Sequence, residues 1–312
     1  MSKPKVYIDG KEGTTGLQIY ERLSARQDIE LLLIDEDKRK DAGERGKLLN
    51  AADLAFLCLP DQAAREAVEL VANDRTRIID ASTAHRTAPG WVYGFPELRG
   101  RRDRILAARW VANPGCHATG FLSGVAPLVE LGVLPADYPL TCYSLTGYSG
   151  GGKKMIAQYE GEKTPDLFSP RTYGLNLEHK HLPEMTAQAG LTQPPVFCPV
   201  VDDYYKGMET VVMLHNRLLR GAPTARDLCD MLGAYYEGQT LVHVAPFGEH
   251  PAQLAANAMA GRDDLTLYVC GDGARTAVIA LFDNLGKGAS GAAVQNMNLM
   301  LGFAETAGLN VE

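Results

Sequence analysis

The chain has 312 residues, enough for two domains of ordinary size. Lys and Arg number 31 and Asp and Glu number 38, so the formal net charge is −7, and the chain lacks the positive field that non-specific binding to nucleic acids or anionic membranes requires. No apolar run is long enough to cross a bilayer as a helix, and the first ten residues do not resemble a secretory signal. Six cysteines without a CxxC pair indicate reduced thiols, so we expect a cytoplasmic protein without a disulfide framework.

The first third of the chain alternates short apolar runs with amphipathic segments. Five runs are predicted to be strands: Val6–Asp9, Ile29–Ile34, Leu54–Leu59, Ile78–Ala81 and Trp110–Ala112. Leu17, Tyr20 and Leu23 recur at helical spacing after the first run, and Asp61 can cap a helix after the third. This alternation predicts an α/β domain with a parallel sheet and helices on both of its faces.

After residue 117 the pattern changes to many strand-like runs with few helices between them. A helix is predicted over Ala118–Leu131, and Thr224 is predicted to cap another over Ala225–Tyr236. The predicted strands are Leu140–Leu145, Val196–Val201, Thr210–Leu214, Leu241–Val244, Leu265–Cys270 and Thr276–Phe282. Asp272 and Gly273 indicate a tight hairpin between the last two. Many strands with few crossovers predict an α+β domain with a mixed or antiparallel sheet, over residues 117–285.

The C-terminal segment is the last predicted helix, Ser290–Thr306. Its apolar stripe consists of Ala293, Met297, Met300 and Ala304. A stripe of this kind needs a partner surface, so we expect this helix to pack on the first domain. The nucleotide-binding domain is therefore expected to comprise residues 1–116 and 286–312.

A glycine-rich turn follows the first predicted strand, with the spacing G-x-x-G-x-x-G. Thr15 and Gln18 fit a capping box that would start the following helix at this point. Glycines let the backbone approach a pyrophosphate, and a helix N-terminus supplies N–H donors, although a close-packed turn would use the same glycines. The residues expected to bind a dinucleotide are Gly10, Gly13, Thr14, Thr15 and Gly16.

The residues alone leave the choice between NAD and NADP open. Asp35 lies about 20 residues beyond the loop, where an acidic group favours the ribose hydroxyls of NAD. The run Lys38–Lys40 follows directly and could grip a 2′-phosphate, or could be a solvated charge run.

Cys116 lies in the segment Asn113-Pro114-Gly115-Cys116-His117, between a predicted strand and a predicted helix. At a helix N-terminus, the dipole and free N–H groups lower the pKa of a thiol and can hold an oxyanion. We therefore predict that Cys116 is a nucleophile. The other cysteines lie in apolar strands or a helix and are expected to be small buried residues: Cys58, Cys142, Cys198, Cys229 and Cys270.

Three motifs together resemble the N-acetyl-gamma-glutamyl-phosphate reductase family in its shorter type. They are N-P-G-C-H-A-T-G around Cys116, D-G-K-E-G-T-T-G in the N-terminal loop and D-N-L-G-K-G-A-S-G over Asp283–Gly291. The resemblance covers essentially the whole chain, and the family is related to aspartate-semialdehyde dehydrogenases. It implies a Rossmann domain, an α+β catalytic domain, NADPH as reductant, an acyl phosphate as substrate, arginine biosynthesis as pathway and self-association as a dimer or tetramer.

His179, His181 and Glu184 are similar to the H-x-H-x-P-E pattern of that family, in which a histidine is the acid/base. Histidine titrates in the range that proton transfer at neutral pH needs. We favour His179 over His181, with Glu184 orienting an imidazole; a surface helix cap is the alternative. A metal site lacks a further placed ligand, so no metal is expected. His117, beside the nucleophile, is expected to point away from it.

A second glycine-rich loop spans residues 146–154 and resembles the S-G-x-S-G-x-G-[RK] loop of the family. Ser149, Gly150 and Lys153 suit an anionic group of the substrate, although a flexible surface loop has the same composition. Ser82 and Arg86 follow a predicted strand of the first domain. There the resemblance implies a cofactor contact for Ser82, and Arg86 is a candidate for the substrate carboxylate or phosphate.

Two asparagines complete the predicted site. Asn113 is expected to contact the substrate. Asn284 matches the family position that faces the nicotinamide amide, the alternative being an asparagine in a turn.

The predicted reaction is the NADPH-dependent reduction of N-acetylglutamyl 5-phosphate to the 5-semialdehyde and phosphate, through a thioester on Cys116. The alternatives are a related acyl-phosphate reductase, such as an aspartate-semialdehyde dehydrogenase, and a non-catalytic NADP-binding regulator. The Cys116 turn and the second glycine-rich loop argue against a regulator.

Overall fold

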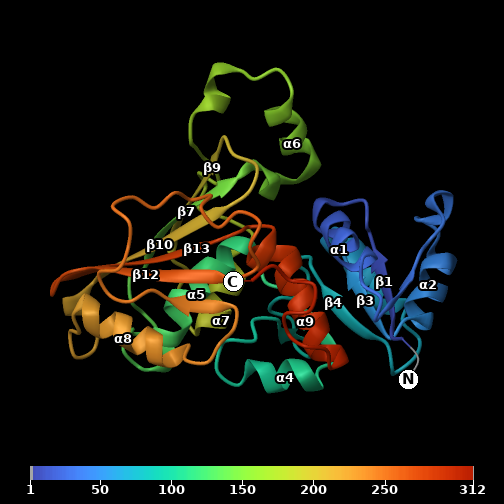
Figure 1. Ribbon diagram of the computed structural model, residues 1–312, viewed down its shortest axis with the longest axis horizontal. Coiled ribbons are helices and arrows are strands. Elements are labelled where there is room, and N and C mark those ends of the chain that lie inside the picture. The colour runs from blue at the N-terminus through green and yellow to red at the C-terminus, as the bar shows by residue number, and fades with distance from the viewer. Residues whose placement is uncertain (1–2, 312) are drawn as a thin grey trace. The chain divides into compact units, whose positions relative to one another are not determined.

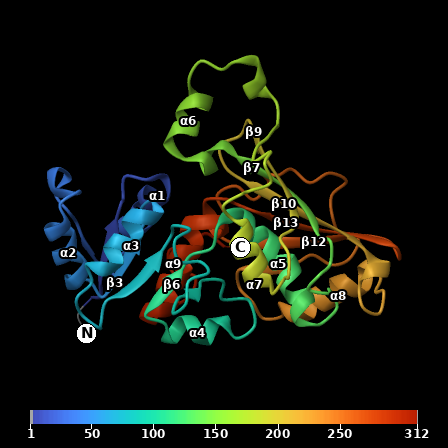
Figure 2. The same ribbon diagram turned by 180° about the vertical axis from the view of Figure 1, so that it is seen from behind.

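A computed structural model describes residues 3–311, which form two compact units (Figures 1 and 2). The first unit consists of the described residues up to Pro96, with Gly100–Pro114 and Ala289–Leu309. The second consists of Glu97–Arg99, Gly115–Gly288 and the described residues from Asn310. No helix within residues 3–311 is long and apolar enough to cross a membrane.

The first unit is built on a six-stranded sheet in which every pairing is parallel, in the order β2-β1-β3-β4-β6-β5. Its strands are β1 (Lys5–Asp9), β2 (Glu30–Leu32), β3 (Leu54–Leu57), β4 (Arg77–Asp80), β5 (Val92–Tyr93) and β6 (Trp110–Ala112). Its helices are α1 (Thr14–Ser24), α2 (Ala42–Ala51), α3 (Asp61–Glu69), α4 (Arg101–Ala107) and α9 (Gly291–Leu301), with a 3₁₀ turn η1 (Glu36–Lys38). The α/β prediction is confirmed.

Two apolar clusters show that helices cover both faces of this sheet. One cluster joins β1, β3 and β4 to α1, α4 and α9, and includes Ala293, Val294 and Met297 of α9. The other joins the same strands to α2 and α3 through Leu49 and Ala67. The C-terminal helix therefore packs on the first unit, as predicted, although it ends at Leu301, before the predicted stripe residue Ala304.

The helix that the spacing of Leu17, Tyr20 and Leu23 predicts forms as α1; Leu23 is buried, whereas Leu17 is 45% exposed. Two local predictions for this unit are wrong. The N-cap of α1 is Gly13 and makes no side-chain cap bond, so the capping box at Thr15 does not form. Asp61 is the first residue of α3 rather than its cap, because its carboxylate accepts hydrogen bonds from Thr83 instead.

The second unit contains a seven-stranded mixed sheet in the order β11-β12-β13-β10-β7-β9-β8. Its strands are β7 (Thr141–Gly147), β8 (Arg171–Thr172), β9 (Val196–Asp202), β10 (Met208–His215), β11 (Val242–Val244), β12 (Leu265–Gly271) and β13 (Arg275–Phe282). Strands β12, β13, β10 and β7 are antiparallel neighbours, whereas β7 pairs with β9 and β11 with β12 in parallel. The predicted mixed sheet and the hairpin at Asp272 are confirmed.

Helices of the second unit are α5 (Cys116–Glu130), α6 (Gly152–Glu160), α7 (Leu182–Ala189) and α8 (Ala225–Tyr235). Short turns complete it: η2 (Tyr148–Gly151), η3 (Pro165–Phe168), η4 (Asn216–Leu218) and the π-helical η5 (Gly286–Ser290). Thr224 caps α8 in a full capping box with Asp227, as predicted for the cap. In Figures 1 and 2, α6 stands beyond the ends of β7 and β9, away from the other helices of its unit.

Helix α5 lies directly against the sheet because two of its residues are glycines. A Cβ atom at Gly120 would lie 2.4 Å from Oγ1 of Thr210 on β10, and one at Gly124 would lie 2.8 Å from Cγ1 of Val278 on β13. This close approach fixes the helix, and with it the position of its first residue, Cys116, relative to the strands.

Candidate active site

The N-terminal glycine loop joins β1 to α1 in the first unit. Gly10 has φ +86°, and a Cβ there would lie 2.4 Å from the carbonyl oxygen of Cys58, at the end of β3. A Cβ at Gly16 would lie 2.4 Å from the carbonyl oxygen of Gly10. These two glycines are therefore required by close backbone packing. Gly13, in contrast, has no heavy atom closer than 3.5 Å to its ideal Cβ.

A cavity of about 420 Å³ opens beside this loop. Its lining residues come from the loop, the end of β3, the segment after β2 and the start of α2: Ile8, Asp9, Gly10, Lys11, Glu12, Gly13, Ile34, Glu36, Arg39, Lys40, Arg45, Cys58, Leu59, Pro60 and Ala63. A glycine loop, a helix N-terminus and a pocket at the carboxyl ends of parallel strands are the features that hold a dinucleotide. The residues present thus fit such a ligand.

Charged side chains of both signs line this cavity, and Asp35 is not among them. Asp35 is exposed and pairs with Lys38 at 3.0 Å, and neither residue lines the cavity. Arg39 and Lys40 do line it, with Arg39 2.8 Å from Glu36. A ligand in this cavity would therefore meet Arg39 and Lys40 rather than Asp35.

The predicted residues at the ends of β4 and β6 are engaged with the backbone and with one another inside the first unit. Ser82 donates its hydroxyl to Asp80 at 2.7 Å, and the same carboxylate receives Nδ1 of His85 at 2.6 Å. Arg86 is buried and donates to the carbonyl oxygens of Asn113 and Ala81.

The side chain of Asn113 is also engaged within the first unit. Its amide nitrogen donates to the carbonyl oxygen of Ala289, and its amide oxygen accepts from Asn296. Arg86 and Asn113 together therefore fix the backbone just before Pro114.

Cys116 is the first residue of α5, with Gly115 as N-cap, and is partly exposed. The N–H group of Gly115 donates to Oε2 of Glu184 at 3.1 Å. The backbone of η5 lies against the cysteine, since a Cβ at Gly288 would be 3.0 Å from Cβ of Cys116. The cysteine thus begins a helix, as its sequence context predicts.

Most of the other cysteines differ from Cys116 in their surroundings. Burial raises the pKa of four of their thiols, those of Cys58, Cys142, Cys229 and Cys270. These four thiols are protonated at neutral pH. Cys142 and Cys229 are buried, as predicted, whereas Cys58, Cys198 and Cys270 are partly exposed and differ from that prediction.

His179 and His181 lie together with His117, which the sequence analysis had set aside. The ring of His179 meets that of His117 edge-on, with centroids 5.2 Å apart, and that of His181 at 4.8 Å. Nδ1 of His179 accepts the N–H of His181 at 3.1 Å, so a neutral His179 carries its proton on Nε2. Burial and the nearby Lys180 lower the pKa of His179 to about 4, so the ring is neutral at neutral pH.

Glu184 connects this histidine group to the cysteine turn. It is buried on α7, and its Oε1 lies 4.0 Å from Nε2 of His181 while its Oε2 accepts from Gly115. The four predicted catalytic residues, Cys116, His179, His181 and Glu184, are therefore brought together around the first turn of α5.

His117 also joins polar residues that the sequence analysis missed. Its Nδ1 lies 2.9 Å from Oγ of Ser144 and its Nε2 2.7 Å from the hydroxyl of Tyr173. Ser144 in turn lies 2.8 Å from Oγ1 of Thr210. The available signal was a hydroxyl residue on the inward face of two predicted strands, where an apolar side chain is usual.

The second glycine-rich loop follows β7 and leads into α6. Ser149 is buried and accepts a hydrogen bond from the amide of Asn284 at 3.0 Å, while Oδ1 of Asn284 accepts from the N–H of Gly207. Gly150 in η2 and Lys153 in the first turn of α6 are exposed. The side chain of Asn284 therefore fixes this loop within the second unit.

Comparison with known proteins reveals similarity over nearly the whole chain. Residues 5–107 match the family model described as semialdehyde dehydrogenase, NAD binding domain, and residues 116–284 match semialdehyde dehydrogenase, dimerisation domain. N-acetyl-gamma-glutamyl-phosphate reductase 2 of Nostoc sp. is 49% identical, covering 99% of this chain and 100% of its own. The N-acetyl-gamma-glutamyl-phosphate reductase of Sinorhizobium medicae is 50% identical, covering 96% and 99%.

Solved structures share the fold at much lower identity. Aspartate semialdehyde dehydrogenase II of Vibrio cholerae superposes with a TM-score of 0.72 at 16% identity, over 96% of this chain and 99% of its own. The aspartate semialdehyde dehydrogenase of Francisella tularensis superposes with a TM-score of 0.71 at 13% identity, over 94% and 99%.

Proposed function

Because the chain belongs to the N-acetyl-gamma-glutamyl-phosphate reductase family of the semialdehyde dehydrogenases, we propose that it reduces N-acetylglutamyl 5-phosphate to the 5-semialdehyde and phosphate in arginine biosynthesis. The observation that carries this proposal is the position of Cys116, a partly exposed thiol at a helix N-terminus beside grouped histidines. We place the protein in the cytoplasm, because the six cysteines of the chain are free thiols and that compartment is reducing.

The reductant is a nicotinamide dinucleotide, and we assign NADPH. The loop Gly10–Gly16 would hold the pyrophosphate, and Arg39 and Lys40 would hold the 2′-phosphate, because both line the cavity beside that loop. A bound NADPH supplies the hydride that the reaction needs.

Cys116 forms the covalent intermediate. Its thiolate attacks the acyl carbon and a C–S bond forms. The bond between the acyl carbon and the bridging oxygen breaks, phosphate leaves with that oxygen, and a thioester remains. Backbone N–H groups in the first turn of α5 would stabilise the oxyanion that forms on the acyl oxygen. After hydride addition to the thioester carbon, the C–S bond breaks, the aldehyde is released and the thiolate returns.

His179 donates a hydrogen bond from its neutral ring to the reacting oxygen and so stabilises the negative charge that develops there. With Nδ1 occupied by the backbone of His181, its Nε2–H is the group that can reach a substrate. His181 is the more buried of the two and lies beside Glu184, so it supports the position of His179 rather than meeting substrate.

The loop after β7 binds the anionic end of the substrate. Gly150 presents bare backbone, Lys153 supplies a positive charge and the N-terminus of α6 adds N–H donors. Strand β7 carries both Ser144, bonded to His117, and this loop, so the loop is tied to the nucleophile's surroundings through one strand.

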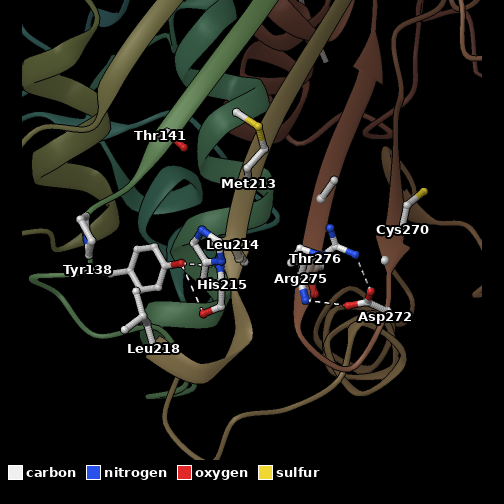
Figure 3. Close-up of a pocket in the computed structure, with 13 residues that line it drawn as sticks. Tyr138, Thr141, Met213, Leu214, His215, Leu218, Cys270, Asp272, Arg275 and Thr276 are labelled. Carbon is white, nitrogen blue, oxygen red and sulfur yellow. Dashed lines mark hydrogen bonds and ion pairs between the residues drawn. The ribbon is translucent and has the colours of Figure 1, made fainter.

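The protein self-associates through the open face of the second sheet. Thr210 and Val278 face α5, so their neighbours Met213, Ile279 and Ala277 face away from it. A cavity of about 730 Å³ lies at the end of this face, with Met213, Thr141 and Cys270 along its wall (Figure 3).

Met213 is 43% exposed there, and a second copy of the chain would cover it. Met213→Glu should convert an oligomer to a monomer in light scattering coupled to gel filtration. A variant with unchanged mass would contradict this interface.

The reaction is tested by Cys116→Ser in the reverse direction, with N-acetylglutamate semialdehyde, phosphate and NADP⁺. We expect the rate to fall by about 10⁴-fold or more, because serine is a far weaker nucleophile. Cys270→Ser is the matched control and should retain full activity. Retention of most activity by Cys116→Ser would refute the proposal, and a preference for aspartate semialdehyde would redirect it to the related substrate.

A further inference from the structure

A line of buried polar side chains runs from the sheet of the second unit to the first turn of α5. It consists of Thr210 on β10, Ser144 on β7, His117 on α5 and Tyr173 after β8, joined by hydrogen bonds of 2.8, 2.9 and 2.7 Å. Thr210, Ser144 and His117 are each at most 2% exposed. Burial of a polar group costs free energy unless the group has a hydrogen-bond partner, so we expect a line of buried polar residues to have a functional role.

The hydrogen bonds of this line have a preferred direction. Within residues 3–311 the Thr210 hydroxyl has only Ser144 as partner, so it donates to Ser144, because a buried donor without an acceptor is costly. Ser144 then donates to Nδ1 of His117. A neutral imidazole that accepts at Nδ1 carries its proton on Nε2, and it donates that proton to the oxygen of Tyr173.

The ring of His117 stays neutral, which preserves this direction. Burial is the main cause that holds its pKa well below the ordinary range, and His179 and Lys180 add to the effect. The hydroxyl proton of Tyr173 is therefore not used within the line, and it is free to be donated elsewhere.

Tyr173 is held next to the reacting groups. Its N–H donates to the carbonyl of Pro199 on β9, and its ring centroid lies 5.8 Å from that of His179. Burial, with a further contribution from the charge on Cys116, raises the pKa of the Tyr173 phenol. The phenol therefore remains a protonated donor, and its hydrogen bond to His117 holds it beside the residue that follows Cys116.

We infer that Tyr173 donates a hydrogen bond to the sulfur of Cys116 and then to the oxyanion of its thioester, and that His117 is the positioning residue that holds Tyr173 there. The second target rests on the proposed function. The first does not, because a thiolate exists without substrate or cofactor.

The test is the rate of Cys116 alkylation by iodoacetamide as a function of pH, read by peptide mass spectrometry on the full chain without cofactor. Tyr173→Phe should raise the apparent pKa of the Cys116 thiol by about one pH unit, because the thiolate loses a hydrogen-bond donor. At pH values below that pKa, alkylation should be about tenfold slower. Tyr143→Phe is the matched control: its hydroxyl bonds Glu209 instead, and the profile should not move.

His117 is tested by variants that separate its two contacts. His117→Asn retains a partner for Ser144 but loses Tyr173, so it should match Tyr173→Phe, and the double variant should shift no further. His117→Gln, whose amide reaches Tyr173, should recover part of the effect. Ser144→Ala should shift the profile in the same direction and replaces Tyr173→Phe if that variant does not fold.

Two outcomes would overturn the inference. An unshifted profile in folded Tyr173→Phe would remove the donor role, and additive shifts in the double variant would remove the positioning role of His117. If either result is obtained while Cys116 of the wild type reacts faster than a free thiol, the proposed reaction still stands. A wild-type Cys116 with the reactivity of a free thiol, and no NADP⁺ reduction, would instead refute the reaction itself.

Discussion

The glycine loop of the first unit and the Cys116 turn of the second are both helix N-termini that follow a strand, but they are built in opposite ways. The first is shaped by missing atoms: Gly10 and Gly16 leave room for backbone at distances where no Cβ could fit. The second is shaped by side chains, because His117, His179 and Glu184 pack around the turn from three different segments. A site made by the backbone should therefore fail when atoms are added, and a site made by side chains should fail when they are removed.

Apart from loss of the nucleophile itself, the largest effect is expected at His179. His179→Asn removes the Nε2–H donor and should lower kcat by about 10²–10³-fold, within the usual contribution of a positioned acid or base. His179→Gln, which can place an amide N–H near the same point, should recover about tenfold. The measurement is steady-state kcat with circular dichroism to verify folding. A larger loss in His181→Asn than in His179→Asn would reverse the assignment of the two histidines.

Gly16→Ala should cause the next largest loss. Its added Cβ meets the backbone of Gly10 and Lys11, which cannot yield as a flexible side chain does. We expect unfolding in urea to show a loss of about 1–3 kcal/mol, the usual cost of overpacking, and NADPH affinity to fall by at least about tenfold. Gly13→Ala is the control, since its Cβ would make only ordinary contacts and stability should be unchanged. Equal stability of the two variants would contradict the close-packing argument.

Removal of the positive charges of Arg39 and Lys40 should change cofactor selectivity without changing stability. The double variant Arg39→Ala, Lys40→Ala loses charge-assisted contacts to a 2′-phosphate, so KM for NADPH should rise about tenfold while KM for NADH stays the same. Lys38→Ala, outside the cavity and paired with Asp35, should leave both values unchanged. A parallel rise in both KM values would indicate a general effect on the loop instead of recognition of the phosphate.

The smallest effect is on acid stability and belongs to the second unit. The pKa of His179 is about 4 in the folded chain against 6.5 as its ordinary value, so the unfolded chain binds more protons between these pH values. Stability should therefore fall as pH drops from about 6.5 to about 4. His179→Gln should reduce this dependence by less than one proton, measured as the pH slope of the unfolding free energy. A variant with the wild-type slope would show that His179 does not titrate in this way.

The backbone-built site could be predicted from local sequence, and the side-chain-built site only in part. The spacing of Gly10, Gly13 and Gly16 after an apolar run is a local pattern, and so is the strand–turn–helix context of Cys116. Tyr173 lies 57 residues from Cys116 in the chain, and its relation to His117 depends on the pairing of β8 with β9. Local patterns do not carry that kind of information.

The errors at the starts of α1 and α3 have a related cause. Asp61 is predicted to cap the helix that follows it, but its carboxylate accepts a hydrogen bond from Thr83 instead. Hydrogen bonds between distant segments compete with local ones, and the sequence does not rank them. The prediction of the Thr224 cap succeeded because its partner, Asp227, is three residues away.

Helix α9 has a consequence for synthesis of the chain on the ribosome. Val294, Met297 and Met300 fill a cluster whose other members were made up to 294 residues earlier, starting with Val6 on β1. The nascent first unit must therefore wait, with one apolar face of its sheet incompletely covered, until the codons of α9 are translated, and the main segment of the second unit, Gly115–Gly288, is made before that point. A nonsense mutation just before the codons of α9 would accordingly leave an aggregation-prone product, because that face of the sheet would stay uncovered.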